Sequence, residues 1–210
     1  HVFQVAHRMG LAVHLPYGLY KHAYPSFQLV KVDPKLIQWH AENDFIKSLP
    51  SFISSGDWDL SGYEISTSLR YARVSDIIQH HADVKASKTF IEFMKCAEEE
   101  KPVLRHGDAL KSEEDILEYI HGIVNIYHSM LKDGYKSSGE LGVDEGDICV
   151  GIGRDGKLVH LQTGHHRLAL AQLANCPTVS VRVMVIHSHW WKRHGGIYPA
   201  VTNTGHYGEC

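Results

Sequence analysis

Apolar residues recur at intervals of three and four through the middle of the chain, a spacing that places them on one face of a helix. The pattern extends from about residue 68 to 100 and again over 111–134. Ser112 stands at the start of the second stretch with Asp115 at the distance of a capping box, and Gly134 is suited to a helix end. The sequence therefore predicts two helical stretches, the second with both ends defined.

In the last third of the chain the period of the pattern falls to two. Valine fills alternate positions, namely Val179, Val181, Val183 and Val185. This alternation predicts a strand with one buried face. Residues 147–163 predict two strands joined at "RDG" (154–156), because Asp-Gly suits a type I′ hairpin. Residues 27–40 predict another strand, interrupted at Asp33-Pro34 because proline cannot donate to a ladder.

Strands near both ends of the chain, with helices between them, predict an α/β (α+β) protein with a small mixed sheet and flanking helices. Residues 28–191 are expected to form a single domain that contains an added helical segment at about 68–110. Residues 1–27 are rich in His, Tyr, Gly and Pro and predict an irregular lead-in, while 192–210 predict an irregular tail.

Composition narrows the class of protein. The chain has 210 residues, of which 43% are hydrophobic and 21% charged, as in ordinary globular proteins. Its net charge of −3 makes a nucleic-acid partner a weaker hypothesis, because duplex-binding proteins carry a basic surface. No run approaches the roughly 20 apolar residues of a membrane span. The cysteines are scattered, which favours free thiols and a cytoplasmic location: Cys96, Cys149, Cys176 and Cys210.

Histidine is unusually frequent, with 17 residues. Zinc sites combine histidine with cysteine or carboxylate at fixed spacings, such as CxxC or HExxH. Neither spacing occurs here, so the sequence predicts no structural zinc site and leaves open whether the histidines hold another metal.

Residues 163–168 open the final apolar run with a glycine, two histidines and an arginine. The start of a helix is electropositive, and Gly164 would let a ligand approach the backbone closely. Arg167 offers a planar pair of donors that matches phosphate oxygens. His165 and His166 add donors or proton carriers. These properties favour a phosphate site, while the alternative is a polar helix start whose arginine pairs with an acid.

With its neighbours, this motif resembles the core of the ParB/sulfiredoxin superfamily. The order is a helix, "SMLKDGYKSS", a strand, "GRDGK", a strand, and "TGHHRLALAQLANCPTVSVRVMVI". The resemblance covers roughly residues 112–190, and "VKVDPKLI" is similar to the first strand of the family. Two further elements, "SGDWD" (55–59) and "VIHSHWW" (185–191), are similar to uncharacterised ParB-domain proteins that carry a G-D-W-D element.

The resemblance implies a ParB/sulfiredoxin-like fold that binds a nucleoside phosphate, ATP or ADP with Mg²⁺, at the turn. The implied binding residues are Thr163, Gly164, His165, His166, Arg167 and Leu168. Sulfiredoxin activity is not expected, because His165 stands where that enzyme has its catalytic cysteine. A partitioning clamp is not expected either, because the clamps have a paired-arginine turn, where this chain has His166-Arg167, and a following helix-turn-helix domain. A kinase fits better, although Thr163 stands where related kinases commonly have an acid.

Three residues outside the turn complete the candidate site. Asp57 and Asp59 could supply a metal ligand or a general base, and His165 and His166 are the other candidates for catalysis. The alternative for the acids is a plain turn beside a buried Trp58. Trp190 could stack on a nucleobase or close the edge of the core.

The sequence therefore predicts a nucleotide-dependent phosphotransferase that acts on a hydroxyl-bearing small molecule or glycan. A nuclease or nucleic-acid-binding module is one alternative, and a nucleotide sensor without catalysis is another.

Overall fold

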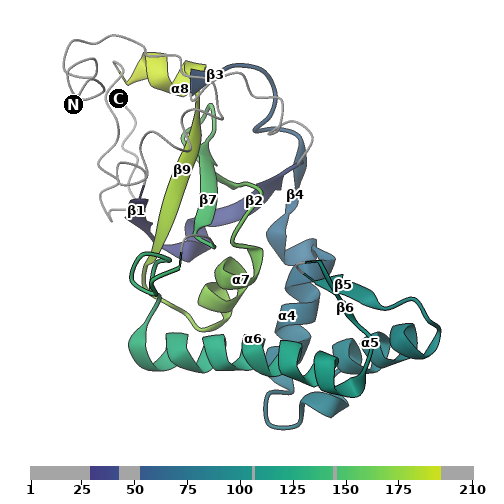
Figure 1. The fold of residues 1–210 in the computed structure, drawn as a ribbon. Coiled ribbons are helices and arrows are strands. Elements are labelled where there is room, and N and C mark those ends of the chain that lie inside the picture. Colours follow the sequence, from purple (N-terminus) through teal and green to yellow (C-terminus); the bar gives the residue numbers. More distant parts are fainter. Residues whose placement is uncertain (1–28, 43–52, 106, 144–145, 195–210) are drawn as a thin grey trace. The chain divides into compact units, whose positions relative to one another are not determined.

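The computed structural model describes most of the chain between the two ends (Figure 1), namely residues 29–42, 53–105, 107–143 and 146–194. The predicted lead-in, and the predicted tail from residue 195 on, lie outside the described residues. Internal contacts divide the chain into two compact units, which are described separately. Unit 1 comprises residues 1–65, 136–164 and 177–210, and unit 2 comprises residues 66–135 and 165–176.

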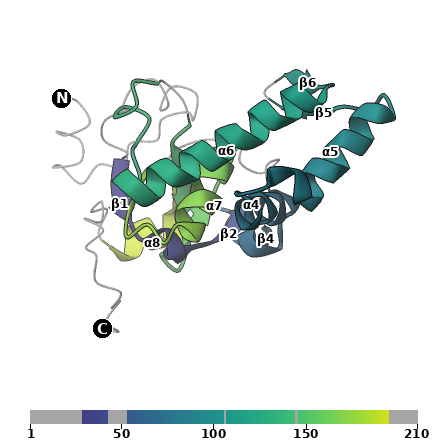
Figure 2. The same ribbon diagram turned by 90° about the horizontal axis from the view of Figure 1, so that it is seen from below.

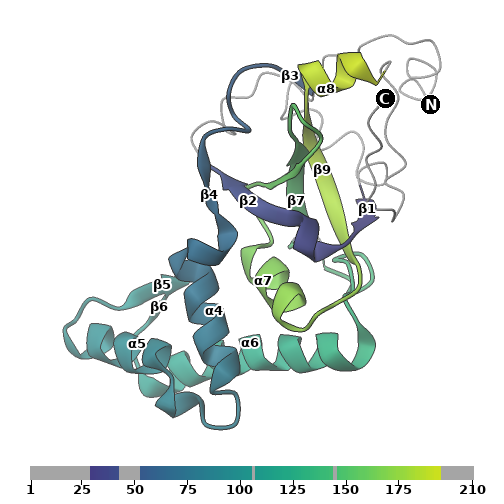
Figure 3. The ribbon, with the colours of Figure 1, turned by 180° about the vertical axis from the view of Figure 1, so that it is seen from behind.

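Unit 1 contains a seven-stranded mixed sheet, seen from behind in Figure 3. Across the sheet the order is β1 (Leu29–Val32), β9 (Val179–His187), β7 (Ile148–Ile152), β8 (Leu158–His160), β2 (Ile37–Ala41) and β4 (Gly62–Glu64), and β3 (Ile53–Ser54) pairs with β9. β9 runs parallel to β7 and β3 and antiparallel to β1, while β2 runs parallel to β8. The predicted mixed α/β class is confirmed.

The interruption predicted at Asp33-Pro34 is confirmed. A short 3-10 helix, η1 (Pro34–Leu36), separates β1 from β2. Asp33 caps it, since its side chain accepts a hydrogen bond from the backbone N–H of Lys35 at 2.8 Å. Proline fits this position because the first residue of a helix needs no donor.

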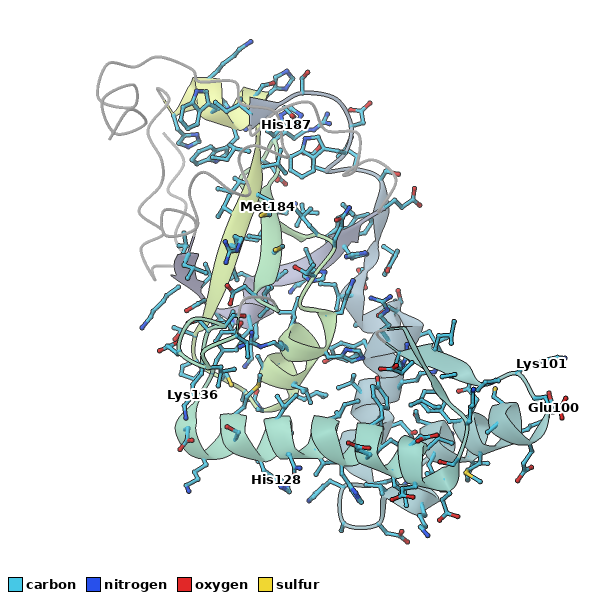
Figure 4. The ribbon with its side chains drawn as sticks, viewed as in Figure 1. Glu100, Lys101, His128, Lys136, Met184 and His187 are labelled. Atoms are coloured by element: carbon cyan, nitrogen blue, oxygen red, sulfur yellow. The ribbon has the colours of Figure 1, made fainter. Side chains whose placement is uncertain are left out.

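Strand β9 is buried more completely than its sequence period predicts. The four alternate valines are buried, as expected. Met184, which lies between Val183 and Val185, is buried as well, and so is Ile186, which follows Val185 (Figure 4 labels Met184). Met184 lies in a buried cluster with Ala41 and Leu161 from other parts of the chain, and a strand covered on both faces needs apolar residues at every position. The prediction of one buried face is therefore wrong for residues 183–187.

The hairpin predicted at "RDG" joins β7 to β8, but its turn is not type I′. A type I′ turn requires positive φ at both central residues. Here Gly156 has φ of 87° while Asp155 is not among the residues with positive φ. The Gly156 N–H donates to the Gly153 carbonyl at 2.9 Å, so Arg154 and Asp155 form the turn and Gly156 follows it in the left-handed region.

Unit 2 consists of helices and a small two-stranded sheet (Figure 2). Its elements are α4 (Leu69–Gln79), α5 (Lys88–Glu98), β5 (Val103–Arg105), β6 (Asp108–Leu110), α6 (Glu113–Asp133) and α7 (His165–Leu173). α7 packs against α4 and α6. The helical segment expected at about 68–110 is thus part of a larger unit that also contains α6 and α7.

Capping residues set the helix ends in unit 2. The capping box predicted at Ser112 and Asp115 begins α6, and Gly134 ends it with φ of 78°. The single helical stretch predicted from residue 68 to 100 is two helices, because Ser87 caps a new helix start by accepting from the Phe90 N–H at 3.1 Å. None of the helices in the described part of the chain is both long and apolar enough to span a bilayer.

One further helix, α8 (Ser188–Arg193), follows β9 directly in unit 1. The predicted irregular tail is therefore wrong at its first two residues. His187 caps α8, since its ring nitrogen Nδ1 accepts from the His189 N–H at 3.1 Å. α8 packs against β9 and β3.

Replacement of Gly151 in β7 by alanine is expected to destabilise the protein. A Cβ at this position would lie 2.7 Å from the Trp58 ring and 2.9 Å from a Val185 methyl group. We expect Gly151→Ala to lower the free energy of unfolding by about 1–3 kcal/mol, the usual cost of overpacking a core. The control is Gly122→Ala in α6, where nothing lies within 4 Å and alanine should stabilise the helix by about 0.5–1 kcal/mol. Urea unfolding measures both, and equal effects would contradict the prediction.

Candidate functional site

Gly164 lies at the end of the turn in unit 1 and is tightly packed. Its φ is 84°, a conformation that favours glycine. A Cβ there would lie 2.6 Å from the Cα of Ile148 and 3.0 Å from the carbonyl oxygen of Asp147. The close approach that the sequence analysis attributed to a ligand is thus made by the start of β7.

Thr163 anchors the turn to the same strand. Its hydroxyl donates to the Asp147 carbonyl at 3.1 Å and lies 2.9 Å from the sulfur of Cys149. Its carbonyl accepts from the Cys149 N–H at 3.3 Å and lies 2.9 Å from Nε2 of His160. Thr163, which stands where an acid is common in the family it resembles, therefore has a hydroxyl that is already engaged with β7.

Asp147 fixes the strand beneath this turn. Its carboxylate forms an ion pair with Arg182 at 2.9 Å and accepts from the Ser138 N–H at 2.8 Å. Burial acts to raise the pKa of Asp147, but these hydrogen bonds and the arginine charge hold it below its usual value. The carboxylate is thus ionised, and its partners are structural.

Two buried histidines face each other across β2 and β8. The Nδ1 atoms of His40 and His160 are 2.9 Å apart, and the residues are 2% and 1% exposed. A carbonyl can only accept, so Nε2 of His160 donates to Thr163, and in the neutral ring its Nδ1 accepts from His40. Two nitrogens on one tetrahedral zinc ion would lie about 3.3 Å apart. The distance between the two Nδ1 atoms is therefore close to that between two ligands of one metal ion. The hydrogen bond between the two rings already accounts for it.

In unit 2 the first residues of α7 contact two tyrosines. Nε2 of His166 lies 3.1 Å from the hydroxyl of Tyr119 in α6. The guanidinium carbon of Arg167 lies 4.7 Å from the centre of the Tyr135 ring, within the range of a cation–π contact. His165, His166 and Arg167 are half-buried, whereas Leu168 is 1% exposed and belongs to the core.

Arginines surround the tyrosine that His166 contacts. We call this set the arginine–tyrosine cluster, and its members are Arg73, Phe93, Arg105, Tyr119 and His166. The guanidinium carbon of Arg105 lies 5.4 Å from the centre of the Tyr119 ring and 5.6 Å from that of Phe93. Arg73 lies 5.1 Å from the Phe93 ring on the α4 side.

The charges of this cluster are only partly balanced. Arg73 forms an ion pair with Glu92 at 2.5 Å. Nε of Arg105 is buried and bonded to no described residue. Burial raises the pKa of Tyr119, and the positive charges of Arg105, Arg73 and Arg70 offset only part of that effect. The helix start at His166 therefore adjoins an excess of positive charge within unit 2.

The candidate acids Asp57 and Asp59 are brought together by Arg154, the first residue of the "RDG" turn. Nη2 of Arg154 donates to Asp57 at 2.7 Å and to Asp59 at 2.8 Å. Its Nε and its backbone N–H also donate to Asp59, at 3.1 and 2.7 Å. The Asp59 side chain is 3% exposed and that of Asp57 is 74% exposed.

This arrangement disfavours the catalytic roles considered for both acids. Burial acts to raise the pKa of Asp59, but the hydrogen bonds from Arg154 and its positive charge hold that pKa below its usual value. A carboxylate with a lowered pKa is a weak base, and a bound guanidinium repels a cation. Asp57 and Asp59 therefore do not fit the magnesium ligands or general base expected from the sequence, and no step is assigned to them.

His187 and Trp190 close the same end of unit 1. Nε2 of His187 donates to the Gly56 carbonyl at 2.9 Å, which fixes its tautomer, since Nδ1 accepts in α8 (Figure 4). Trp190 is 4% exposed, and its ring stacks on His194 with centroids 4.1 Å apart. The geometry fits a core-closing tryptophan better than a platform for a nucleobase.

Several of these residues carry no signal in the sequence. Arg154 contacts Asp59 across 95 residues, and Tyr119 contacts His166 across 47. The "GRDG" string predicts a turn and "GDWD" a loop, but nothing in either string pairs them. Comparison with known proteins finds no family model, curated protein or solved structure that matches this chain.

The Arg154–Asp59 contact is expected to stabilise the fold. Arg154→Ala leaves Asp59 buried without a counter-charge and should lower the free energy of unfolding at pH 7 by about 3–5 kcal/mol. The pKa of Asp59 is lower in the folded state, so its contribution is complete above the unfolded-state value near 3.9 and is lost as the pH falls through the folded-state value. The difference in stability between wild type and Asp59→Asn should therefore shrink below about pH 4.

A matched control tests whether the removal of another acid near Arg154 lowers the stability as much as Asp59→Asn does. Asp155 is half exposed and pairs with Lys157 at 2.8 Å. Asp155→Asn should change stability by less than about 1 kcal/mol, as for other surface pairs. Urea unfolding between pH 3 and 8 measures all the variants. A pH-independent loss in Asp59→Asn would show that the carboxylate charge does not matter.

Proposed function

We propose that this protein binds the phosphates of a nucleotide at the start of α7 and transfers a phosphoryl group from it to a hydroxyl-bearing small molecule or glycan. The observation that carries the proposal is the excess positive charge beside that helix start. Arg167 stands in the first turn of α7, and His166 contacts Tyr119, which the arginines surround. The amino-terminal end of a helix also favours anions.

The arginine–tyrosine cluster supports a ligand with more than one phosphate. Arg105 has a buried Nε that no described residue satisfies, and such a donor gains by bonding to an anion. A guanidinium group can hold one phosphate by two parallel bonds in its own plane, and that of Arg167 lies over the Tyr135 ring. A diphosphate or triphosphate would bring the charges that this cluster lacks. ATP or ADP therefore remains the proposed ligand.

Phosphoryl transfer needs positioning and charge stabilisation more than covalent chemistry from the protein. Arg167 and Arg105 would stabilise the charge on the transferring group. The acceptor oxygen forms its bond to phosphorus as the bond to the leaving oxygen breaks, and the acceptor proton needs a base. His165 and His166 are the proposed bases, since Asp59 is held by Arg154. Any Mg²⁺ would enter with the nucleotide phosphates.

Nucleotide binding is expected to depend on Arg167. Isothermal titration with ADP, with and without magnesium, should give saturable binding to the full chain. Arg167→Ala should weaken it about ten- to a hundredfold, the usual effect of losing hydrogen bonds to a charged group. Arg105→Ala should weaken it as well. The matched control is Lys95→Ala, whose side chain is 73% exposed on α5 and should leave ADP affinity unchanged.

Absence of ADP binding to the wild-type chain would refute the proposal. Binding without transfer of labelled phosphate from ATP to any hydroxyl acceptor would identify a nucleotide sensor instead of an enzyme. DNA binding that weakens steeply with salt, together with strand cleavage, would favour the nuclease alternative.

A further inference from the structure

A cavity of about 490 Å³ opens in unit 1 beside the β7–β8 hairpin and α8. Its lining residues come from these two elements and are Arg154, Asp155, His189, Lys192 and Arg193. All of them lie in unit 1, so the cavity is distinct from the α7 residues of the proposed nucleotide site. Its volume is within the range of about 300–1,000 Å³ that small-molecule sites occupy.

The two elements that line the cavity are fixed to each other. A Cβ on Gly156 would lie 2.9 Å from Nε1 of Trp190, so the hairpin packs directly on the buried face of α8. Nη2 of Arg193 donates to the carbonyl of Arg154. Arg154 is itself held by the 56–59 loop through both Nε and Nη2. The backbone that carries the positive side chains is therefore held in place by these contacts.

Positive charge in the lining exceeds negative charge. Asp155 already pairs with Lys157 at 2.8 Å. Within the described part of the chain, the Lys192 side chain forms no ion pair or hydrogen bond, and Nη1 of both Arg154 and Arg193 donates to no acceptor. Asp57 and Asp59 occupy other donors of Arg154 and leave Nη1 available. His189 is exposed and adds a ring that can donate.

We propose that this cavity binds the phosphate group of a small phosphorylated molecule. Two guanidinium groups and an ammonium group line the cavity, and guanidinium geometry matches phosphate oxygens. The cavity is larger than a single phosphate ion, which leaves room for the organic part of the ligand. This inference does not depend on nucleotide binding at α7, because the two sites share no residue.

Inorganic pyrophosphate, titrated calorimetrically into the full chain at low ionic strength, tests the inference. The double variant Lys192→Ala/Arg193→Ala should weaken binding at this cavity by about a hundredfold, and Lys192→Ala alone by about tenfold. The Lys192 side chain forms no ion pair or hydrogen bond with a described residue, so the single variant should fold normally and keeps the test valid if the double variant is unstable. Lys95→Ala removes an exposed lysine of unit 2 that does not line the cavity; it is the charge control and should have no effect.

Arg167→Ala separates this site from the proposed nucleotide site. Pyrophosphate binding that survives Arg167→Ala and is lost in the Lys192 variants supports the cavity, even if ADP does not bind at α7. Binding that is lost only in Arg167→Ala supports the α7 site and overturns the cavity. Equal affinity of wild type and both Lys192 variants overturns it too, as does sulfate binding as tight as that of pyrophosphate, which would indicate an unspecific charged surface.

Discussion

Burial of β9 on both faces is the constraint on which the rest of unit 1 depends. Three strands hydrogen-bond to it, β1, β7 and β3, so its register fixes theirs. Its second half leaves no room for polar side chains except His187, which is satisfied by a carbonyl of the 56–59 loop and by α8. Trp58 then fits beside β7 because Gly151 has no side chain. The sheet, the loop and the last helix are therefore held by one strand.

Arginine pairing decides which charged groups remain available for chemistry. Asp57 and Asp59 look like candidate acids in isolation, but Arg154 binds both, and the low pKa of Asp59 makes it a weak base. In unit 2 the balance is reversed, since Arg105 has a buried nitrogen without a bonded acceptor among the described residues. The same residue type thus pairs with two acids in one unit and has a buried donor without a described acceptor in the other.

Much of the fold could be predicted because its signals are local. The capping box at Ser112, the break at Asp33-Pro34 and the alternation of valines each depend on a few neighbouring residues. The predictions that are wrong depended on distant partners. Met184 in β9 is buried in a cluster with residues far away in sequence, such as Ala41 and Leu161, and the hairpin turn type follows from backbone angles that Asp-Gly alone does not determine.

The features of the candidate site also divide into local ones, which the sequence predicts, and contacts between distant residues, which it does not. The sequence by itself determined that α7 begins with two histidines and an arginine after a glycine, because a helix start is a local feature. Only the tertiary structure decided what these residues contact. Gly164 is required by the close approach of β7, His166 contacts Tyr119, and the loop acids pair with Arg154. Such contacts join residues 16, 47 and 95 positions apart, and the charge that a side chain retains depends on them.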